Sequence, residues 1–172
     1  MLDKRAGTRR SARPMDRLDA QTEERPLILL IENDDSDVFL FRRALSKLEY
    51  EGDVRVVGSV SEARAYMENK GSYTDASYFR RPQLIVSDFR LSGPTALDFV
   101  RWLREESKDA ELPVVILSGA VRAADLPQLT SAGVNELIYK TPDVMALATR
   151  LQPILPIVLA TLIASGVLRC AA

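Results

Sequence analysis

The stretch Leu84-Ile85-Val86-Ser87-Asp88 places a carboxylate at the end of an apolar run. A short run of this kind is typical of a strand that is buried on both faces, as the strands of a parallel sheet are. In α/β proteins the functional groups lie at the edge of the sheet where such strands end. Asp88 is therefore the first candidate for a functional residue in this chain.

Three other apolar runs also end in polar side chains. Glu32-Asn33-Asp34-Asp35 follows residues 27–31, Ser118 follows residues 114–117, and Lys140 follows residues 137–139. If these strands are parallel, the four polar ends converge on one rim of the sheet. Carboxylates beside an ammonium and a hydroxyl can bind a cation and an anion together, which suits transfer of a phosphoryl group to a carboxylate.

The rest of the chain alternates between strand and helix patterns. A further strand is expected at residues 54–57, and a polar, aromatic loop at residues 71–82. Helices are expected over residues 36–48, from Ser59 as a cap, over residues 95–105 and 125–132, and from Thr141 as the cap of the last one. This order predicts an α/β fold with a five-stranded parallel sheet and helices on both faces.

The polar strand ends resemble the receiver domain of two-component response regulators. Asp88 precedes Ser118 by 30 positions and Ser118 precedes Lys140 by 22, both usual in that family. The resemblance spans roughly residues 26–156 and implies a flavodoxin-like, doubly wound (βα)5 fold. The long segment before Leu84 is similar to that of the stand-alone receivers that partner bacterial phytochrome-type histidine kinases.

The resemblance implies a role for each side chain. Asp88 is expected to be the phosphoacceptor, the nucleophile toward phosphorus. Ser118 is expected to donate a hydrogen bond to a phosphoryl oxygen, and Lys140 to pair with the acceptor carboxylate or its phosphate. In this role the chain is a signalling protein and not an enzyme, with self-dephosphorylation as its one chemical act.

The expected metal site departs from the family pattern at Asn33. The implied ligands of Mg²⁺ are Glu32, Asn33, Asp88 and the backbone carbonyl of Arg90. The family usually has Asp at the second of these positions, so the neutral amide of Asn33 is expected to reduce the affinity for Mg²⁺. Asp34 could turn inward to compensate, or Asp34, Asp35 and Asp37 could serve as helix caps and solvated acids.

Four more positions depart from the family pattern: Ser92, Thr95, Leu137 and Thr141. These departures leave two functions open. The first is a stand-alone receiver that accepts phosphate on Asp88 from a histidine kinase or phosphotransfer protein and signals by a change of conformation or dimerisation. The second is a pseudo-receiver, a protein-binding or dimerisation module that works without phosphate. A phosphatase with an Asp nucleophile is disfavoured because no second acid–base group stands out.

Composition limits the alternatives. The chain has 172 residues, enough for one domain with tails, and the formal net charge is -1. It contains no histidine, so it cannot itself be a histidine kinase or phosphotransfer protein. Its single cysteine, Cys170, allows no internal disulfide and no cysteine-based metal site, and a cytoplasmic location is expected.

The two ends differ in character. Residues 1–25 begin with a basic stretch that we interpret as a solvated, disordered arm, with no nucleic acid expected as a partner. Residues 157–172 form an apolar tail. Because Pro153 and Pro156 interrupt the apolar run, the remaining piece is shorter than the roughly 20 residues of a spanning helix. We expect this tail to pack on its own domain or in a homodimer and not in a membrane.

Overall fold

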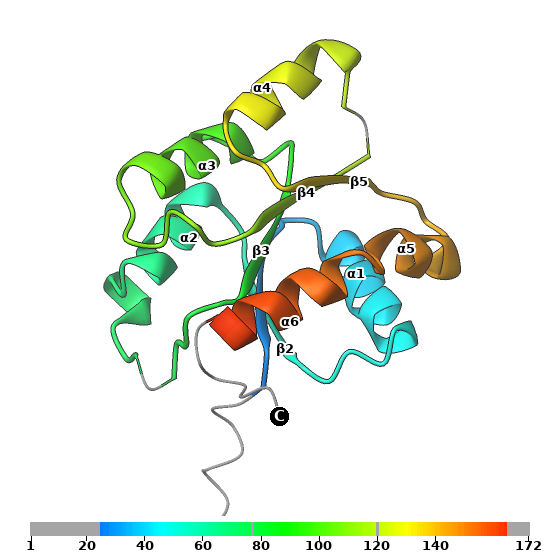
Figure 1. Cartoon of the computed structure of the whole chain (residues 1–172), viewed down its shortest axis with the longest axis horizontal. Coiled ribbons are helices and arrows are strands. Elements are labelled where there is room, and N and C mark those ends of the chain that lie inside the picture. The colour runs from blue at the N-terminus through cyan, green and yellow to red at the C-terminus, as the bar shows by residue number, and fades with distance from the viewer. Residues whose placement is uncertain (1–24, 77, 120, 165–172) are drawn as a thin grey trace, which may run out of the picture.

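Five parallel strands form a single sheet in this computed structural model (Figure 1). The structure describes residues 25–76, 78–119 and 121–164. In spatial order the sheet is β2 (Asp53–Val57), β1 (Leu27–Ile31), β3 (Leu84–Asp88), β4 (Val114–Ser118) and β5 (Glu136–Tyr139). The strand order reverses between β1 and β3, and their carboxyl ends form the rim at which open α/β sheets bind ligands.

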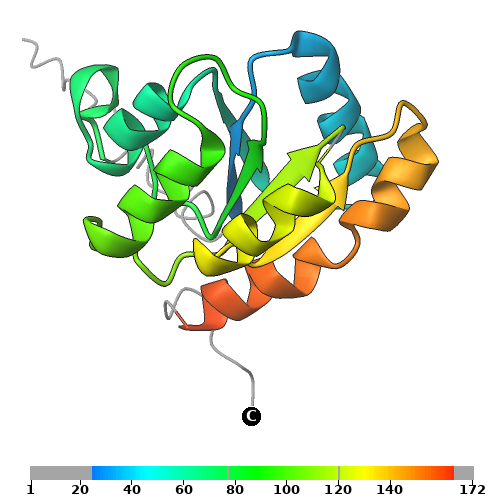
Figure 2. The ribbon, with the colours of Figure 1, turned by 90° about the horizontal axis from the view of Figure 1, so that it is seen from above.

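Helices cover both faces of the sheet, as Figure 2 shows. One core cluster joins the sheet to α2 (Val60–Met67), α3 (Ala96–Glu105) and α4 (Leu126–Ser131). The other joins it to α1 (Asp35–Lys47), α5 (Val144–Leu151) and α6 (Ile154–Ala164). Two short 3-10 turns lie at Gly71–Tyr73 and Ala123–Asp125. The predicted flavodoxin-like, doubly wound fold is confirmed.

The three inner strands explain why the sequence predicted the sheet so clearly. Every residue of β1, β3 and β4 is buried. Along β1, Leu29 and Ile31 pack in the cluster with α2 and α3, while Ile28 and Leu30 pack in the cluster with α1 and α5. Because successive side chains point to opposite faces, a strand covered on both sides needs an unbroken apolar run.

Caps fix where the helices begin. The Asp34 carboxylate accepts hydrogen bonds from the backbone N–H of Ser36 and Asp37, so Asp34 is the N-cap of α1. The prediction that Thr141 caps the last helix of the βα pattern is wrong. Asp143 caps α5 instead, accepting from the N–H of Ala146 at 2.7 Å, because its ionised carboxylate lies directly before the first helical turn.

Helix α6 corrects the prediction of a break at Pro156. Pro156 is the third residue of α6, where a backbone N–H has no partner inside the helix, so a proline is tolerated there. Ile154 and Val158 of this helix are buried in the cluster with α1 and α5. The helix therefore runs across the expected domain boundary at residue 156. The part of the predicted apolar tail beyond residue 164 lies outside the described residues.

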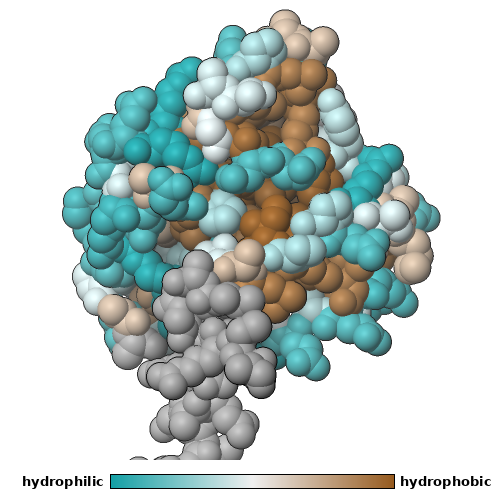
Figure 3. Space-filling view, viewed as in Figure 1, coloured by the Kyte–Doolittle hydropathy of each residue, from teal (hydrophilic) through white to brown (hydrophobic). Residues whose placement is uncertain are grey.

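Some large apolar side chains remain exposed. Leu126 on α4, Tyr139 on β5 and Leu159 on α6 are each more than 40% exposed. The side of the molecule seen in Figure 3 has apolar surface between more polar margins. Among the described helices none alone has the length and apolar character to cross a membrane, although α5 and Ile154–Thr161, bent by 44°, pass that test as a pair.

Candidate functional site

The predicted site residues meet at the carboxyl ends of the strands. Asp88 ends β3, Ser118 ends β4, and Glu32 and Lys140 directly follow β1 and β5. The strand register brings these ends level: Ile31 pairs with Ser87, and Ser118 with Tyr139. The acids and the hydroxyl are nearly inaccessible, with exposed fractions of 4% for Glu32, 8% for Asp88 and 1% for Ser118.

The Lys140 ammonium lies at the centre of this group. Its Nζ is 2.7 Å from Asp88 Oδ1, 2.6 Å from Glu32 Oε2 and 2.7 Å from Asp37 Oδ2. An ammonium has three N–H donors, so each of these carboxylates can receive one. Burial disfavours the charged amine, but the hydrogen bonds to Asp37, Asp88 and Glu32 outweigh it and raise the pKa of Lys140 above its ordinary value.

Backbone N–H groups hold the opposite oxygens of the two buried acids. Arg90 N–H donates to Asp88 Oδ2 at 2.7 Å. The N–H groups of Asn33 and Asp34 donate to Glu32 Oε1 at 2.9 and 3.0 Å. Each carboxylate thus has an ammonium on one oxygen and amide hydrogens on the other. This arrangement fixes the orientation of both carboxylates.

Asp37 is the site residue that sequence reasoning missed. The interpretation as a cap fits Asp34, whose pKa is held below its ordinary value by hydrogen bonds from the Asp37 and Ser36 N–H groups. Asp37, in contrast, reaches Lys140. The sequence did contain an indication of this role. A helix that begins shortly after β1 places its first turn beside the same rim, and Asp37 lies about one turn past the cap.

The position of the Lys140 ammonium among three carboxylates shows that the rim accommodates a positive charge. The oxygen donors around it are of the kind that Mg²⁺ prefers, and the Asn33 amide and the Arg90 carbonyl belong to the same class. The residues therefore fit a hard cation in donor type. Asn33 itself brings no charge to such a cation, and among the described residues no three His, Cys, Asp or Glu side chains are grouped so as to hold a metal.

The β4 side of the rim carries Ser118 and, directly after it, Gly119. Ser118 is joined to the site through its backbone, because its carbonyl accepts a hydrogen bond from Lys140 N–H at 2.8 Å. A Cβ added at Gly119 would contact nothing within 4 Å. The position next to Ser118 is therefore not crowded by other parts of the described structure.

Two of the four departures from the family pattern have structural roles here. Thr95 forms a capping box with Asp98 at the start of α3, which explains a hydroxyl residue at that position. Leu137 is half-buried and packs against the cluster that contains α3, while Tyr139 on the same strand is 44% exposed. Neither residue contributes a group to the rim.

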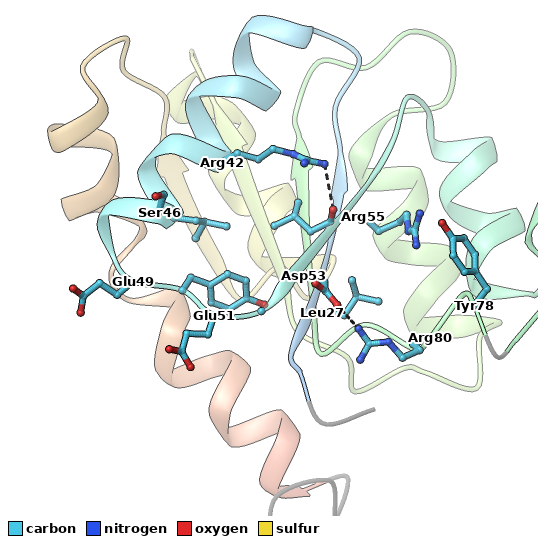
Figure 4. Close-up of a pocket in the computed structure, with 13 residues that line it drawn as sticks. Leu27, Arg42, Ser46, Glu49, Glu51, Asp53, Arg55, Tyr78 and Arg80 are labelled. Atoms are coloured by element: carbon cyan, nitrogen blue, oxygen red, sulfur yellow. Dashed lines mark hydrogen bonds and ion pairs between the residues drawn. The ribbon is translucent and has the colours of Figure 1, made fainter. Parts of the chain in front are cut away.

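A groove in the described structure lies apart from the rim. A groove of about 1400 Å³, which we call the edge groove, runs along the outer side of β2 and includes none of the rim residues (Figure 4). Two of its guanidinium groups are already engaged: Arg42 donates to the Val54 carbonyl, and Arg80 pairs with Asp53. The groups that can do chemistry are therefore at the rim and not in the edge groove.

Comparisons with known proteins identify the family of the chain. The family model described as the response regulator receiver domain matches residues 28–152. The phosphate regulon transcriptional regulatory protein PhoB of Rhizobium meliloti is 25% identical over 145 residues, which are 82% of this chain but 59% of that protein. The chain thus spans less than two thirds of the length of this curated relative.

Solved structures of similar size match over nearly their whole length. The phosphorylated cyanobacterial phytochrome response regulator RcpA is 26% identical, with a TM-score of 0.69 over 80% of this chain and 96% of that one. The Mn²⁺-bound form of response regulator Rcp1 is 22% identical, with a TM-score of 0.66 over 75% and 91%. The structural neighbours include phytochrome-associated response regulators that stand alone.

Proposed function

The chain belongs to the receiver-domain family of response regulators, and from this we propose that it accepts a phosphoryl group on Asp88 from a partner histidine kinase or phosphotransfer protein. The observation that carries the proposal is the Asp88 carboxylate itself. It is buried at the end of β3 and oriented by Lys140 on one oxygen and by the Arg90 N–H on the other. A carboxylate whose orientation is fixed in this way can act as a positioned nucleophile.

In the proposed reaction, an Asp88 oxygen attacks the phosphorus of a phosphohistidine on the partner. A P–O bond to Asp88 forms as the P–N bond breaks, and the partner's imidazole leaves. The Lys140 ammonium neutralises part of the charge on the phosphoryl oxygens, and the Ser118 hydroxyl donates to one of them. Mg²⁺, held by Glu32, Asn33, Asp88 and the Arg90 carbonyl, would supply further positive charge to these oxygens.

A change at the site would reach the protein surface through the residues that contact the phosphoryl group. Ser118 ends β4 and Lys140 directly follows the adjacent strand β5, so a shift of either toward the phosphoryl group would move the surface around α4 and β5. Tyr139 and Leu126 are exposed there and suit contact with a kinase or a second copy of the chain. We propose cytoplasmic signalling without nucleic-acid binding by the described domain.

The test of this function is incubation with acetyl phosphate and Mg²⁺, followed by intact-mass measurement. A receiver gains the mass of one phosphoryl group, and chelation of Mg²⁺ prevents the gain. The second candidate function is the pseudo-receiver, favoured by Asn33 in the metal set. If wild type gains no phosphoryl group and Asn33→Asp does, the chain is a pseudo-receiver silenced at its metal site.

Replacing Asn33 with Asp is expected to raise the affinity for Mg²⁺ about tenfold, since one more negative charge lies near a divalent cation in a partly buried site. The increase can be measured from the stabilisation of the fold against heat as Mg²⁺ is added. Ser36→Asp, which adds the same charge at an exposed position on α1, is the matched control. Equal Mg²⁺ responses in the two variants would remove Asn33 from the metal set.

A further inference from the structure

The contact between Lys140 and Asp37 differs from the other two at the rim. Glu32 and Asp88 belong to the strand ends, and their side chains are 3% and 10% exposed. Asp37 belongs to the first turn of α1, and its side chain is 34% exposed. Lys140 is therefore held from two directions, by the sheet and by a helix that packs beside it.

Asp37 also restores the charge that Asn33 lacks. An acidic pair with an acceptor Asp and a Lys carries two net negative charges, and so does the set Glu32, Asp37, Asp88 and Lys140. Part of the negative charge at the rim is therefore supplied by α1 and not by the end of β1.

Phosphorylation of Asp88 would change just one of the three Lys140 contacts. The ammonium would exchange the Asp88 oxygen for a phosphoryl oxygen, while the contacts with Glu32 and Asp37 can persist. A lysine side chain has four flexible carbons and loses considerable rotamer freedom when it is fixed. If Asp37 contacts Lys140 both before and after transfer, the lysine side chain loses its rotamer freedom during folding. The reaction then does not have to supply that entropy.

We infer that Asp37 is a positioning residue that holds the Lys140 ammonium over Asp88 before and after phosphoryl transfer. This inference rests on the proposed function, since it concerns the same site. Glu32 cannot do this alone, because its other oxygen is engaged by two backbone N–H groups and its carboxylate belongs to the proposed metal set. The Asp37 contact also links α1 to the turn after β5, so a movement of Lys140 is transmitted to α1.

The test compares four proteins: wild type, Asp37→Ala, Asp37→Glu and Asp35→Ala. Asp35 is the matched control because it lies on the same turn of α1, carries the same charge, is exposed, and has no ion pair with Lys140 in the described structure. The rate of phosphorylation by acetyl phosphate with Mg²⁺ is followed by intact mass. We expect Asp37→Ala to be slower by roughly tenfold or more, as for other misplaced catalytic groups. Asp37→Glu should recover most of the rate, and Asp35→Ala should lose little of it.

A second measurement needs neither phosphate nor metal. The thermal stabilities of Asp37→Ala, Lys140→Ala and the double variant form a cycle in metal-free buffer, and the two substitutions should be strongly non-additive. Equal rates for Asp37→Ala and Asp35→Ala, or additive stabilities, would overturn the inference. If wild type takes no phosphoryl group, the proposed function fails, and the stability cycle alone then decides whether Asp37 holds Lys140.

Discussion

Asp88→Asn is expected to abolish phosphoryl transfer to the chain. The amide oxygen is a far weaker nucleophile than a carboxylate. Glu32, the other buried acid of the rim, accepts two backbone N–H groups on one oxygen and the Lys140 ammonium on the other, and it belongs to the proposed metal set. On incubation with acetyl phosphate and Mg²⁺, wild type should gain the mass of a phosphoryl group and Asp88→Asn should gain none.

The fold should survive this substitution. Asn has the shape of Asp, and its one oxygen can still accept the hydrogen bond from the Arg90 N–H, although its NH₂ group cannot accept from Lys140. Lys140 keeps its contacts with Glu32 and Asp37, and the loss of one of three clustered negative charges relieves repulsion. The unfolding temperature of Asp88→Asn shows whether the variant still folds, and Asp35→Asn is a control with the same change of charge. A folded variant that gains no phosphoryl group has lost the nucleophile and not the fold. Phosphorylation of Asp88→Asn at the wild-type rate would place the acceptor on another residue.

How far the sequence predicts this protein depends on the kind of contact. β1 was expected at residues 27–31 and is found there, since a strand between two helical layers tolerates apolar residues alone. The meeting of the polar strand ends was predictable for the same reason, because parallel strands place their ends on one rim and Asp88, Ser118 and Lys140 each end or follow such a run. Both predictions depend on the backbone and not on side-chain geometry.

The wrong or missed predictions concern features that depend on side-chain contacts or on how neighbouring helices and strands pack. Thr141 and Asp143 are both good caps, and the choice of Asp143 depends on how α5 docks on the sheet. Pro156 looked like a break because its place in the first turn of α6 could not be known. Asp37 was missed because its contact with Lys140 requires α1 to lie beside the turn after β5, which is a property of packing.

Lys140→Ala is expected to destabilise the fold by about 3 kcal/mol in metal-free buffer, because it leaves clustered carboxylates with no positive charge among them. Lys140 has its pKa raised in the folded state, so its contribution is fully present at neutral pH and is lost only in strongly alkaline solution. The measurement is urea unfolding at neutral pH. Lys108→Ala, which removes an exposed lysine, should change stability little.

The same variant tests whether the rim is a cation site. With the ammonium removed, Glu32, Asp37 and Asp88 leave a pocket of negative charge that a divalent cation can neutralise. Added Mg²⁺ should therefore recover much of the stability lost by Lys140→Ala and stabilise wild type less, because in wild type the ammonium already occupies the centre. A response to Mg²⁺ no larger than that of wild type would mean that these carboxylates are held apart by the backbone and do not form a metal site even when Lys140 is absent.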